Sequence, residues 1–253
     1  MSLGSASVTR ASSCLALLLL GSYAFGQAAL KRPAADAVSS ESPAIVIGFV
    51  GGFVRGDNAV HGTVQLAAHL QREYPSGVAV KVFENRHEDQ AYREIVRLLD
   101  GDHDGEVSPA EKRNARIVIF GHSWGASEAV ELARQLEKQN IPVLLTVQVD
   151  SIHKYGEDDA RIPANVREAA NFYQSDGWLH GRARIYAADP ERTRIIGNFK
   201  FNYKASSIGC EDRYPMIDRV FMKAHTEIEC DPKVWKEVES LIKSNLTRPG
   251  HGS

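Results

Sequence analysis

The sequence predicts an α/β fold in which a mostly parallel β-sheet is flanked by helices. Short runs rich in β-branched and aromatic residues alternate with longer stretches whose apolar residues recur at helical spacing, a pattern typical of βαβ units. The chain has 253 residues, of which 43% are hydrophobic and 25% charged. This composition is that of a folded protein, and the length suits one core-forming domain of about 200 residues.

The expected strands are short, and helices fill most of the gaps between them. The strands are expected at Ala44 to Phe49, Val78 to Phe83, Arg116 to Phe120, Val143 to Val149 and Ala183 to Ala187. Helical spacing of apolar residues predicts helices around Val64 to Leu70, Ala129 to Leu136, Pro163 to Tyr173 and Val234 to Ile242.

Charge and hydropathy exclude several classes of protein. The formal charge is −2, from 30 basic and 32 acidic residues, and the mean hydropathy is −0.28. These values do not fit a disordered, collagen-like or multi-pass membrane protein. Without a basic excess to neutralise phosphates, no nucleic-acid partner is expected.

The first residues have the layout of a signal peptide. Arg10 precedes a short apolar run from Cys14 to Leu20, and Ala24-Phe25-Gly26 supplies an A-x-A-like cleavage site. The run is shorter than the roughly 20 residues that span a bilayer, so no stable membrane anchor is expected. We therefore expect a secreted or periplasmic protein; the alternative is a disordered apolar tail. The expected organisation is a signal peptide over 1–26, a linker over 27–43, a folded domain over 44–246 and a tail over 247–253.

The cysteines agree with export. Cleavage near Gly26 would remove Cys14 and leave Cys210 and Cys230. An even pair in an oxidising compartment predicts a disulfide. Two unpaired buried thiols are the alternative, favoured if the chain is not exported.

The most informative motif is Gly121-His122-Ser123-Trp124-Gly125, a G-x-S-x-G sequence between an apolar strand and a helical stretch. Glycines beside the serine allow a tight, strained turn that projects the hydroxyl above the sheet. Amides at the start of the following helix can stabilise an oxyanion. Such a short motif also occurs by chance, but the strand before it and the helix after it favour a nucleophilic Ser123 over a structural turn.

On this junction the chain resembles the α/β-hydrolase superfamily, particularly its secreted lipase and esterase branches, over residues 44–245. The resemblance implies a catalytic serine, acid and histidine in that chain order. It places the general base at His225, just before the final helix. Asp150 and Asp189 both end candidate strands and compete for the acid. Most members carry the acid one strand later, which would suit Asp189, but Asp150 directly follows an apolar strand and is our preferred candidate.

The resemblance also implies two backbone amides that bind the oxyanion. One is expected at Trp124, and the other at Phe53 or Gly52, in the glycine-rich loop after the first strand. This loop departs from the His-Gly pattern of many lipases.

A second motif lies between the second strand and the serine motif. Residues 100–111 match an EF-hand calcium loop, with Gly105 at the sharp turn and Val107 at the apolar position. The expected ligands are Asp100, Asp102, Asp104, the Glu106 carbonyl, Ser108 and Glu111. A structural Ca²⁺ ion is therefore expected; a solvated acidic surface loop is the alternative.

These patterns together predict a secreted serine hydrolase that cleaves small-molecule or lipid carboxylic esters, with Ser123, His225 and Asp150 as its triad. Only about thirty residues separate Ser151 from Gly181, which leaves little room for a lid and predicts a minimal cap over an open cleft. A thioesterase or acyltransferase could use the same residues. An inactive, calcium-binding interaction protein is the alternative from another class.

Overall fold

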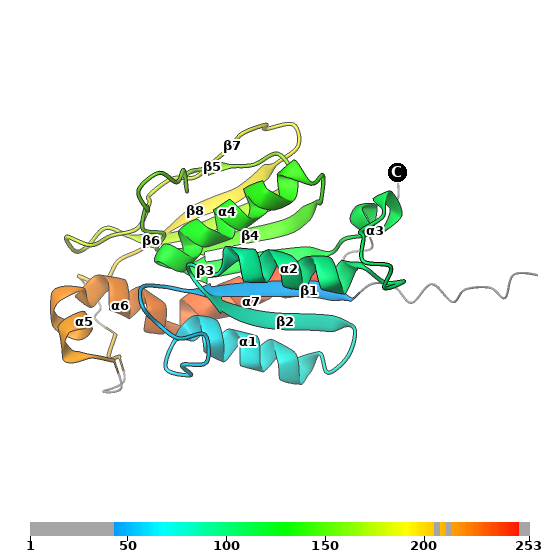
Figure 1. The fold of residues 1–253 in the computed structure, drawn as a ribbon. Coiled ribbons are helices and arrows are strands. Elements are labelled where there is room, and N and C mark those ends of the chain that lie inside the picture. Colours follow the sequence, from blue (N-terminus) through cyan, green and yellow to red (C-terminus); the bar gives the residue numbers. More distant parts are fainter. Residues whose placement is uncertain (1–42, 205–207, 211–213, 248–253) are drawn as a thin grey trace, which may run out of the picture. The chain divides into compact units, whose positions relative to one another are not determined.

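Figure 1 shows the computed structural model of the protein, which describes residues 43–204, 208–210 and 214–247. The predicted signal peptide, its cleavage site and nearly all of the predicted linker and tail lie outside the described residues. Within them, no helix has the length and apolar character needed to cross a membrane.

A six-stranded sheet with the order β2-β1-β3-β4-β6-β8 forms the centre of the described chain, and all of its neighbouring strands are parallel. The predicted fold class is therefore confirmed. The strands are β1 (Ala44–Val50), β2 (Val78–Glu84), β3 (Ile117–His122), β4 (Val143–Val149), β6 (Val166–Gln174) and β8 (Arg194–Phe201). A small parallel pair is formed by β5 (Arg161–Ile162) and β7 (Tyr186–Ala187).

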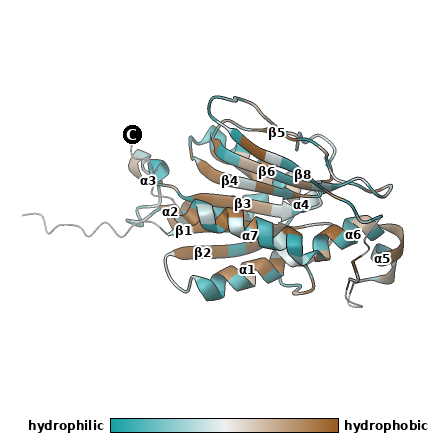
Figure 2. Cartoon of the chain, turned by 180° about the vertical axis from the view of Figure 1, so that it is seen from behind, coloured by the Kyte–Doolittle hydropathy of each residue, from teal (hydrophilic) through white to brown (hydrophobic). Residues whose placement is uncertain are grey.

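Helices cover both faces of the sheet. They are α1 (Gly62–Glu73), α2 (Glu88–Leu99), α3 (Pro109–Arg113), α4 (Trp124–Lys138), α5 (Met216–Phe221), α6 (Lys223–Cys230) and α7 (Pro232–Thr247). Figure 1 shows α2 and α4 in front of the sheet, and Figure 2, from behind, shows α7 in front of it.

Alternating side chains of β1 divide the interior into two cores. Val46 points to the face where α1, α6 and α7 contribute Leu70, Ile228 and Val238. On the other face, apolar side chains of α2 and α4 pack against Ile45 and Ile47. All seven residues of β1 are buried, because a central parallel strand is covered on both sides.

The structure corrects the expected secondary structure in one region. The predicted helix over Pro163 to Tyr173 is wrong, because Val166–Gln174 form β6, paired with β4 and β8. Most of β6 is buried, so the alternation that marks a half-exposed strand is absent from its sequence. The predicted strand at Ala183 to Ala187 is reduced to β7, and the next sheet strand is β8.

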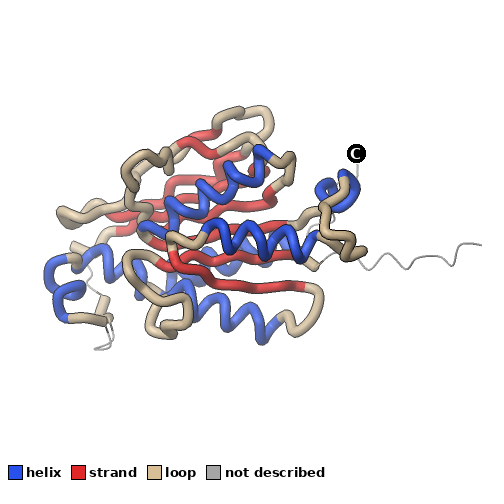
Figure 3. The backbone as a smooth tube through the Cα atoms, viewed as in Figure 1, coloured by secondary structure: helices blue, strands red, loops and turns tan. Residues whose placement is uncertain are grey.

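The parallel arrangement brings the carboxyl ends of all six strands to one edge of the sheet. Figure 3 shows these strands in red, with the helices in blue beside them. Ser123 follows β3 at this edge and Asp150 follows β4. The described connection between β4 and β6 contains only the short strand β5 and no helix. In this type of sheet, ligands bind at the edge formed by the carboxyl ends.

Candidate active site

Ser123 lies in a strained turn between β3 and α4. Its backbone has φ 58° and ψ −127°, a left-handed conformation that is uncommon for a residue with a side chain. The Ser123 amide donates to the Val149 carbonyl at 2.9 Å, which ties the turn to β4. This is the turn that the G-x-S-x-G motif predicts.

The two glycines of the motif allow a close approach of backbones. A Cβ atom on Gly121 would lie 2.2 Å from the Gly125 carbonyl oxygen, and one on Gly125 would lie 2.3 Å from the Phe49 carbonyl oxygen. Backbone atoms cannot move aside as a flexible side chain can. Any larger residue at either position would therefore separate α4 from β1 and β3.

His225 connects the serine to an acid. Its Nε2 lies 2.9 Å from Ser123 Oγ, and its Nδ1 lies 2.7 Å from Asp150 Oδ2. Because an ionised carboxylate only accepts hydrogen bonds, Nδ1 carries the proton and Nε2 is free to accept one from the serine hydroxyl. All three residues are buried, and they come from β3–α4, β4 and α6. The structure thus brings Ser123, His225 and Asp150 into one hydrogen-bonded chain.

Several donors hold the Asp150 carboxylate in place. Oδ1 accepts from the amides of Gln174 at 3.1 Å and Gly181 at 2.8 Å, and Oδ2 accepts from Gln174 Nε2 at 2.8 Å. These three donors fix the orientation of the carboxylate. Gln174 and Gly181 were not identified from the sequence, because they contact Asp150 from β6 and a distant loop.

The competing acid lies elsewhere. Asp189 Oδ1 accepts from the Glu191 amide at 3.0 Å, in the turn before β8. It lines a surface cavity with Arg134 and Arg161. Asp189 has no contact with His225 in the described structure, so Asp150 is the acid that the geometry favours.

Backbone amides without an acceptor lie on both segments next to Ser123. In the part of the chain that the structure describes, the amides of Gly52, Phe53 and Trp124 have no hydrogen-bond acceptor. A Cβ atom on Gly51 would lie 2.7 Å from Ser123 Cβ, so the loop after β1 packs directly on the serine. Trp124 is the first residue of α4. The predicted donors, Trp124 and Phe53, therefore belong to the two segments that flank Ser123.

A buried cluster behind the triad was not predicted. The His122 ring lies 4.7 Å from the His225 ring, centroid to centroid. Glu229 Oε1 lies 3.5 Å from His122 Nδ1 and 2.5 Å from His61 Nδ1. Glu229 is placed there because it stands one helical turn after His225 on α6.

The buried histidine and glutamate have shifted pKa values. Burial lowers the pKa of His122 to about 4, an effect only partly opposed by the carboxylate of Glu229. Burial by itself would raise the pKa of Glu229, but the nearby His122 and His61 outweigh it and the net shift is downward. His122 is therefore neutral near pH 7.

The predicted disulfide between Cys210 and Cys230 is present. Cys230 is the last residue of α6, the helix that carries His225. The disulfide therefore anchors the end of this helix to the segment before α5. No helix was expected at His225 from the sequence.

Three carboxylates lie close together in the acidic loop between α2 and α3. One carboxylate oxygen each from Asp100, Asp102 and Asp104 lies within 4.8 Å of the others, and Gly105 has the positive φ of 90° that the turn requires. Glu111 is directed differently, because its carboxylate accepts from the amides of Gly101 and Ser108 at 2.7 and 2.8 Å. Three of the predicted ligands thus converge, while Glu111 caps the loop.

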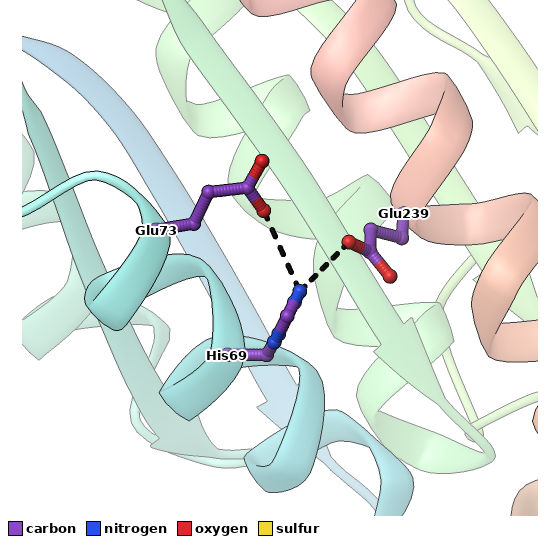
Figure 4. Close-up of side chains that lie close together, drawn as sticks. All are labelled: His69, Glu73 and Glu239. Atoms are coloured by element: carbon purple, nitrogen blue, oxygen red, sulfur yellow. Dashed lines mark ion pairs between the residues drawn. The ribbon is translucent and has the colours of Figure 1, made fainter.

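Another cluster of titratable side chains joins α1 to α7. His69 Nε2 lies 3.4 Å from Glu73 Oε2 and 3.0 Å from Glu239 Oε1 (Figure 4). The Nζ atom of Lys243 lies 2.6 Å from each of these two carboxylates. The ammonium group compensates their charge, so the cluster is an ion-pair network rather than a cation site.

Comparisons with known proteins give similar folds at low identity. No family model matches the sequence, and no curated protein does either. Solved structures with a similar backbone include an esterase from Pseudomonas putida, with 13% identity, a TM-score of 0.45 and coverage of 84% of this chain and 77% of that one. The RedJ thioesterase of Streptomyces coelicolor has 12% identity and a TM-score of 0.41, covering 86% and 98%.

A cutinase-like protein from Cryptococcus is similar at 14% identity and a TM-score of 0.40, with 82% and 97% covered. These values are too low to transfer an activity to this chain.

The buried His122 predicts a loss of stability in acid. Its pKa is about 4 in the folded protein and 6.5 ordinarily, so between these pH values the unfolded chain binds a proton that the folded chain does not. The free energy of unfolding should therefore fall by up to about 3 kcal/mol as the pH drops through this window. In urea unfolding over a pH series, the free energy of unfolding of His122→Gln should decrease less between pH 6.5 and 4 than that of wild type. The exposed His153→Gln variant is the control, and equal slopes for His122→Gln and wild type would contradict the assignment.

Proposed function

We propose that the protein is a serine hydrolase of carboxylic esters that works through an acyl-enzyme intermediate. The observation that carries this proposal is the hydrogen-bonded chain from Ser123 through His225 to Asp150, with free amides beside the hydroxyl. A hydroxyl next to an imidazole, whose other nitrogen is held by a buried carboxylate, is the arrangement of an activated nucleophile.

In the first half of the reaction, Ser123 Oγ attacks the ester carbonyl carbon and His225 Nε2 takes the hydroxyl proton. The carbonyl oxygen becomes an oxyanion, which the amides of Trp124 and Phe53 would bind. Asp150 stabilises the imidazolium that forms. Collapse of the tetrahedral intermediate breaks the ester bond, and the alkoxide leaves with the proton from His225.

In the second half, water attacks the acyl-enzyme carbonyl while His225 takes one of its protons. The acid product leaves and the proton returns to Ser123 Oγ. The Asp150 donors, Gln174 and Gly181, keep the carboxylate in the orientation that both halves need.

Exposed apolar side chains on segments around the site favour a substrate with apolar groups. Phe53, Trp178 and Phe221 are 79%, 75% and 65% exposed. The Phe53 ring packs edge-on against Trp124 at 5.8 Å, and Trp178 Nε1 donates to the Phe221 carbonyl at 2.6 Å. We expect the acyl or alcohol part of the ester to contact these rings.

Export and calcium binding complete the proposal. The disulfide supports folding in an oxidising compartment. The convergence of Asp100, Asp102 and Asp104 supports a Ca²⁺ ion held by oxygen ligands. This loop precedes the amino end of β3, whereas Ser123 follows its carboxyl end, so the ion would stabilise the fold and take no part in the reaction.

A fluorophosphonate probe tests the nucleophile. The wild-type protein should be labelled with one equivalent of probe on Ser123, and Ser123→Ala should not be labelled, because the probe reacts with an activated serine. Ser244→Ala, at an exposed position on α7, is the control and should retain labelling. Absence of labelling in a folded wild-type protein would favour the inactive, calcium-binding alternative. A panel of esters and thioesters with acyl chains of different length would then assign the substrate.

The role of the acid is tested by separate substitutions. Asp150→Asn should lower kcat by roughly 10⁴-fold, because an amide cannot hold His225 in the tautomer that accepts the serine proton. Asp189→Asn should leave kcat within about twofold, since its carboxylate has no contact with His225. The reverse result, with Asp189→Asn inactive, would contradict the assignment.

Calcium should raise the thermal stability. At a calcium concentration one hundred times Kd, the ion should add about 2.7 kcal/mol to the free energy of unfolding, and chelation should remove this gain. Asp102→Asn should weaken both the calorimetric binding signal and the rise in Tm. The exposed Glu191→Gln variant, outside the loop, should behave as wild type. An unchanged Tm with and without chelator would exclude a structural ion.

A further inference from the structure

Phe53, the proposed second oxyanion donor, depends on the orientation of a single peptide group. The Gly52 carbonyl and the Phe53 amide belong to the same planar unit and point in opposite directions. Whatever holds the carbonyl therefore also directs the amide. In this loop the Val54 amide donates to the Gly51 carbonyl at 3.1 Å, which closes a turn around Gly52 and Phe53. Gly52 has a φ of 52°.

The group that holds the Gly52 carbonyl is the side chain of Asn85, whose Nδ2 donates to it. Asn85 is only 6% exposed and follows β2 directly. Val50 at the end of β1 pairs with Glu84 at the end of β2, so the strand register places Asn85 beside the loop. The Asn85 side chain holds the Gly52 carbonyl toward the end of β2. The Phe53 amide of the same peptide group therefore points away from β2.

Lys154 holds Asn85 from the other side. Its Nζ donates to the backbone carbonyl of Asn85 at 2.8 Å, forms an ion pair with Glu128, and lies 3.1 Å from Glu157 Oε1. Glu128 belongs to α4, and the neighbouring Ser127 donates to Glu157 Oε2 at 2.7 Å. One ammonium group thus connects the loop of Phe53 to the helix that begins with Trp124.

The charges around Lys154 keep it in its cationic form. Burial lowers the pKa of this lysine, but the hydrogen bond with Glu128 and the charges of Glu128 and Glu157 outweigh burial, and the net shift is upward. Burial and the hydrogen bond with Glu88 on α2 raise the pKa of Glu128 to about 8, and the contact with Lys154 opposes this shift. Because Lys154 and Glu128 are both largely withdrawn from solvent, their interaction is less screened than a surface ion pair.

We propose that Asn85 is a positioning residue of the oxyanion site, and that Lys154 fixes Asn85 relative to α4. The Asn85 amide orients the Gly52–Phe53 peptide so that the Phe53 amide faces the carbonyl oxygen of the substrate. Preorganised donors stabilise the oxyanion without reorganising during the reaction. This inference rests on the proposed function, because it assigns a role in the same site.

The test compares Asn85→Asp with wild type in ester hydrolysis. The substitution keeps the size of the side chain but replaces the donor with an acceptor that repels the Gly52 carbonyl. We expect kcat to fall on the order of 10²-fold, the effect of removing one oxyanion donor, with KM within about threefold. Affinity for a trifluoromethyl ketone, which forms a tetrahedral adduct with the serine, should fall by the same factor as kcat. A merely structural role would not produce this split.

Asn85→Ala and Lys154→Met provide independent variants if Asn85→Asp does not fold. Lys154→Met should also lower kcat more than it raises KM, and Lys154→Arg should recover part of the loss, because it keeps the charge. Asn140→Asp, in an exposed turn after α4, is the matched control with the same change in charge and should retain wild-type kcat.

The outcomes separate the inference from the proposed function. If wild type neither reacts with the fluorophosphonate probe nor hydrolyses esters, the proposed function fails. If wild type is active and folded Asn85→Asp or Asn85→Ala keeps full kcat, only the positioning role is overturned. A loss of kcat/KM that comes from a higher KM alone, with kcat unchanged, would also overturn the positioning role, because it would indicate a role in substrate binding.

Discussion

The site depends on the strained turn at Ser123, which requires three backbones to meet without side chains between them. Gly121 and Gly125 leave room for the carbonyls of α4 and β1, and no residue with a Cβ would fit. The same turn donates its amide to Val149, the residue before Asp150. The pairing of β3 with β4 therefore fixes the distance between the nucleophile and the acid. The packing of β1, β3 and β4 in the interior keeps Ser123 in its strained backbone conformation with positive φ.

Each remaining component of the site reaches the same edge through the parallel sheet. The loops after β1, β2 and β4 meet at Asn85 and Lys154, whereas β6 supplies Gln174 to hold the acid. The histidine comes from α6, whose last residue is anchored by the disulfide. The residues of the site are therefore held by several rigid elements, which keep the hydrogen-bond donors in place before the substrate binds.

Local patterns in the sequence predicted those features of the site that are formed by residues close together in the chain. The G-x-S-x-G turn, the strand before it and the disulfide were all predicted from local patterns. The resemblance to a hydrolase superfamily implied the order of serine, acid and histidine and placed the base at His225, while the apolar strand before Asp150 favoured it as the acid. β6 was mistaken for a helix because a buried central strand carries no alternation. The contacts of Glu229, Asn85 and Lys154 have no local sequence pattern, since each joins segments far apart in the chain and only the fold brings them together.

The acyl-enzyme intermediate is the most direct test of this account. Rapid acid quench during turnover of a slowly deacylating ester, followed by mass spectrometry of the proteolytic peptide that contains Ser123, should show this peptide heavier by the mass of the acyl group. The modification should be located on Ser123 and disappear when substrate is exhausted. Ester turnover without any acylated Ser123, or acylation of another residue, would contradict the central claim.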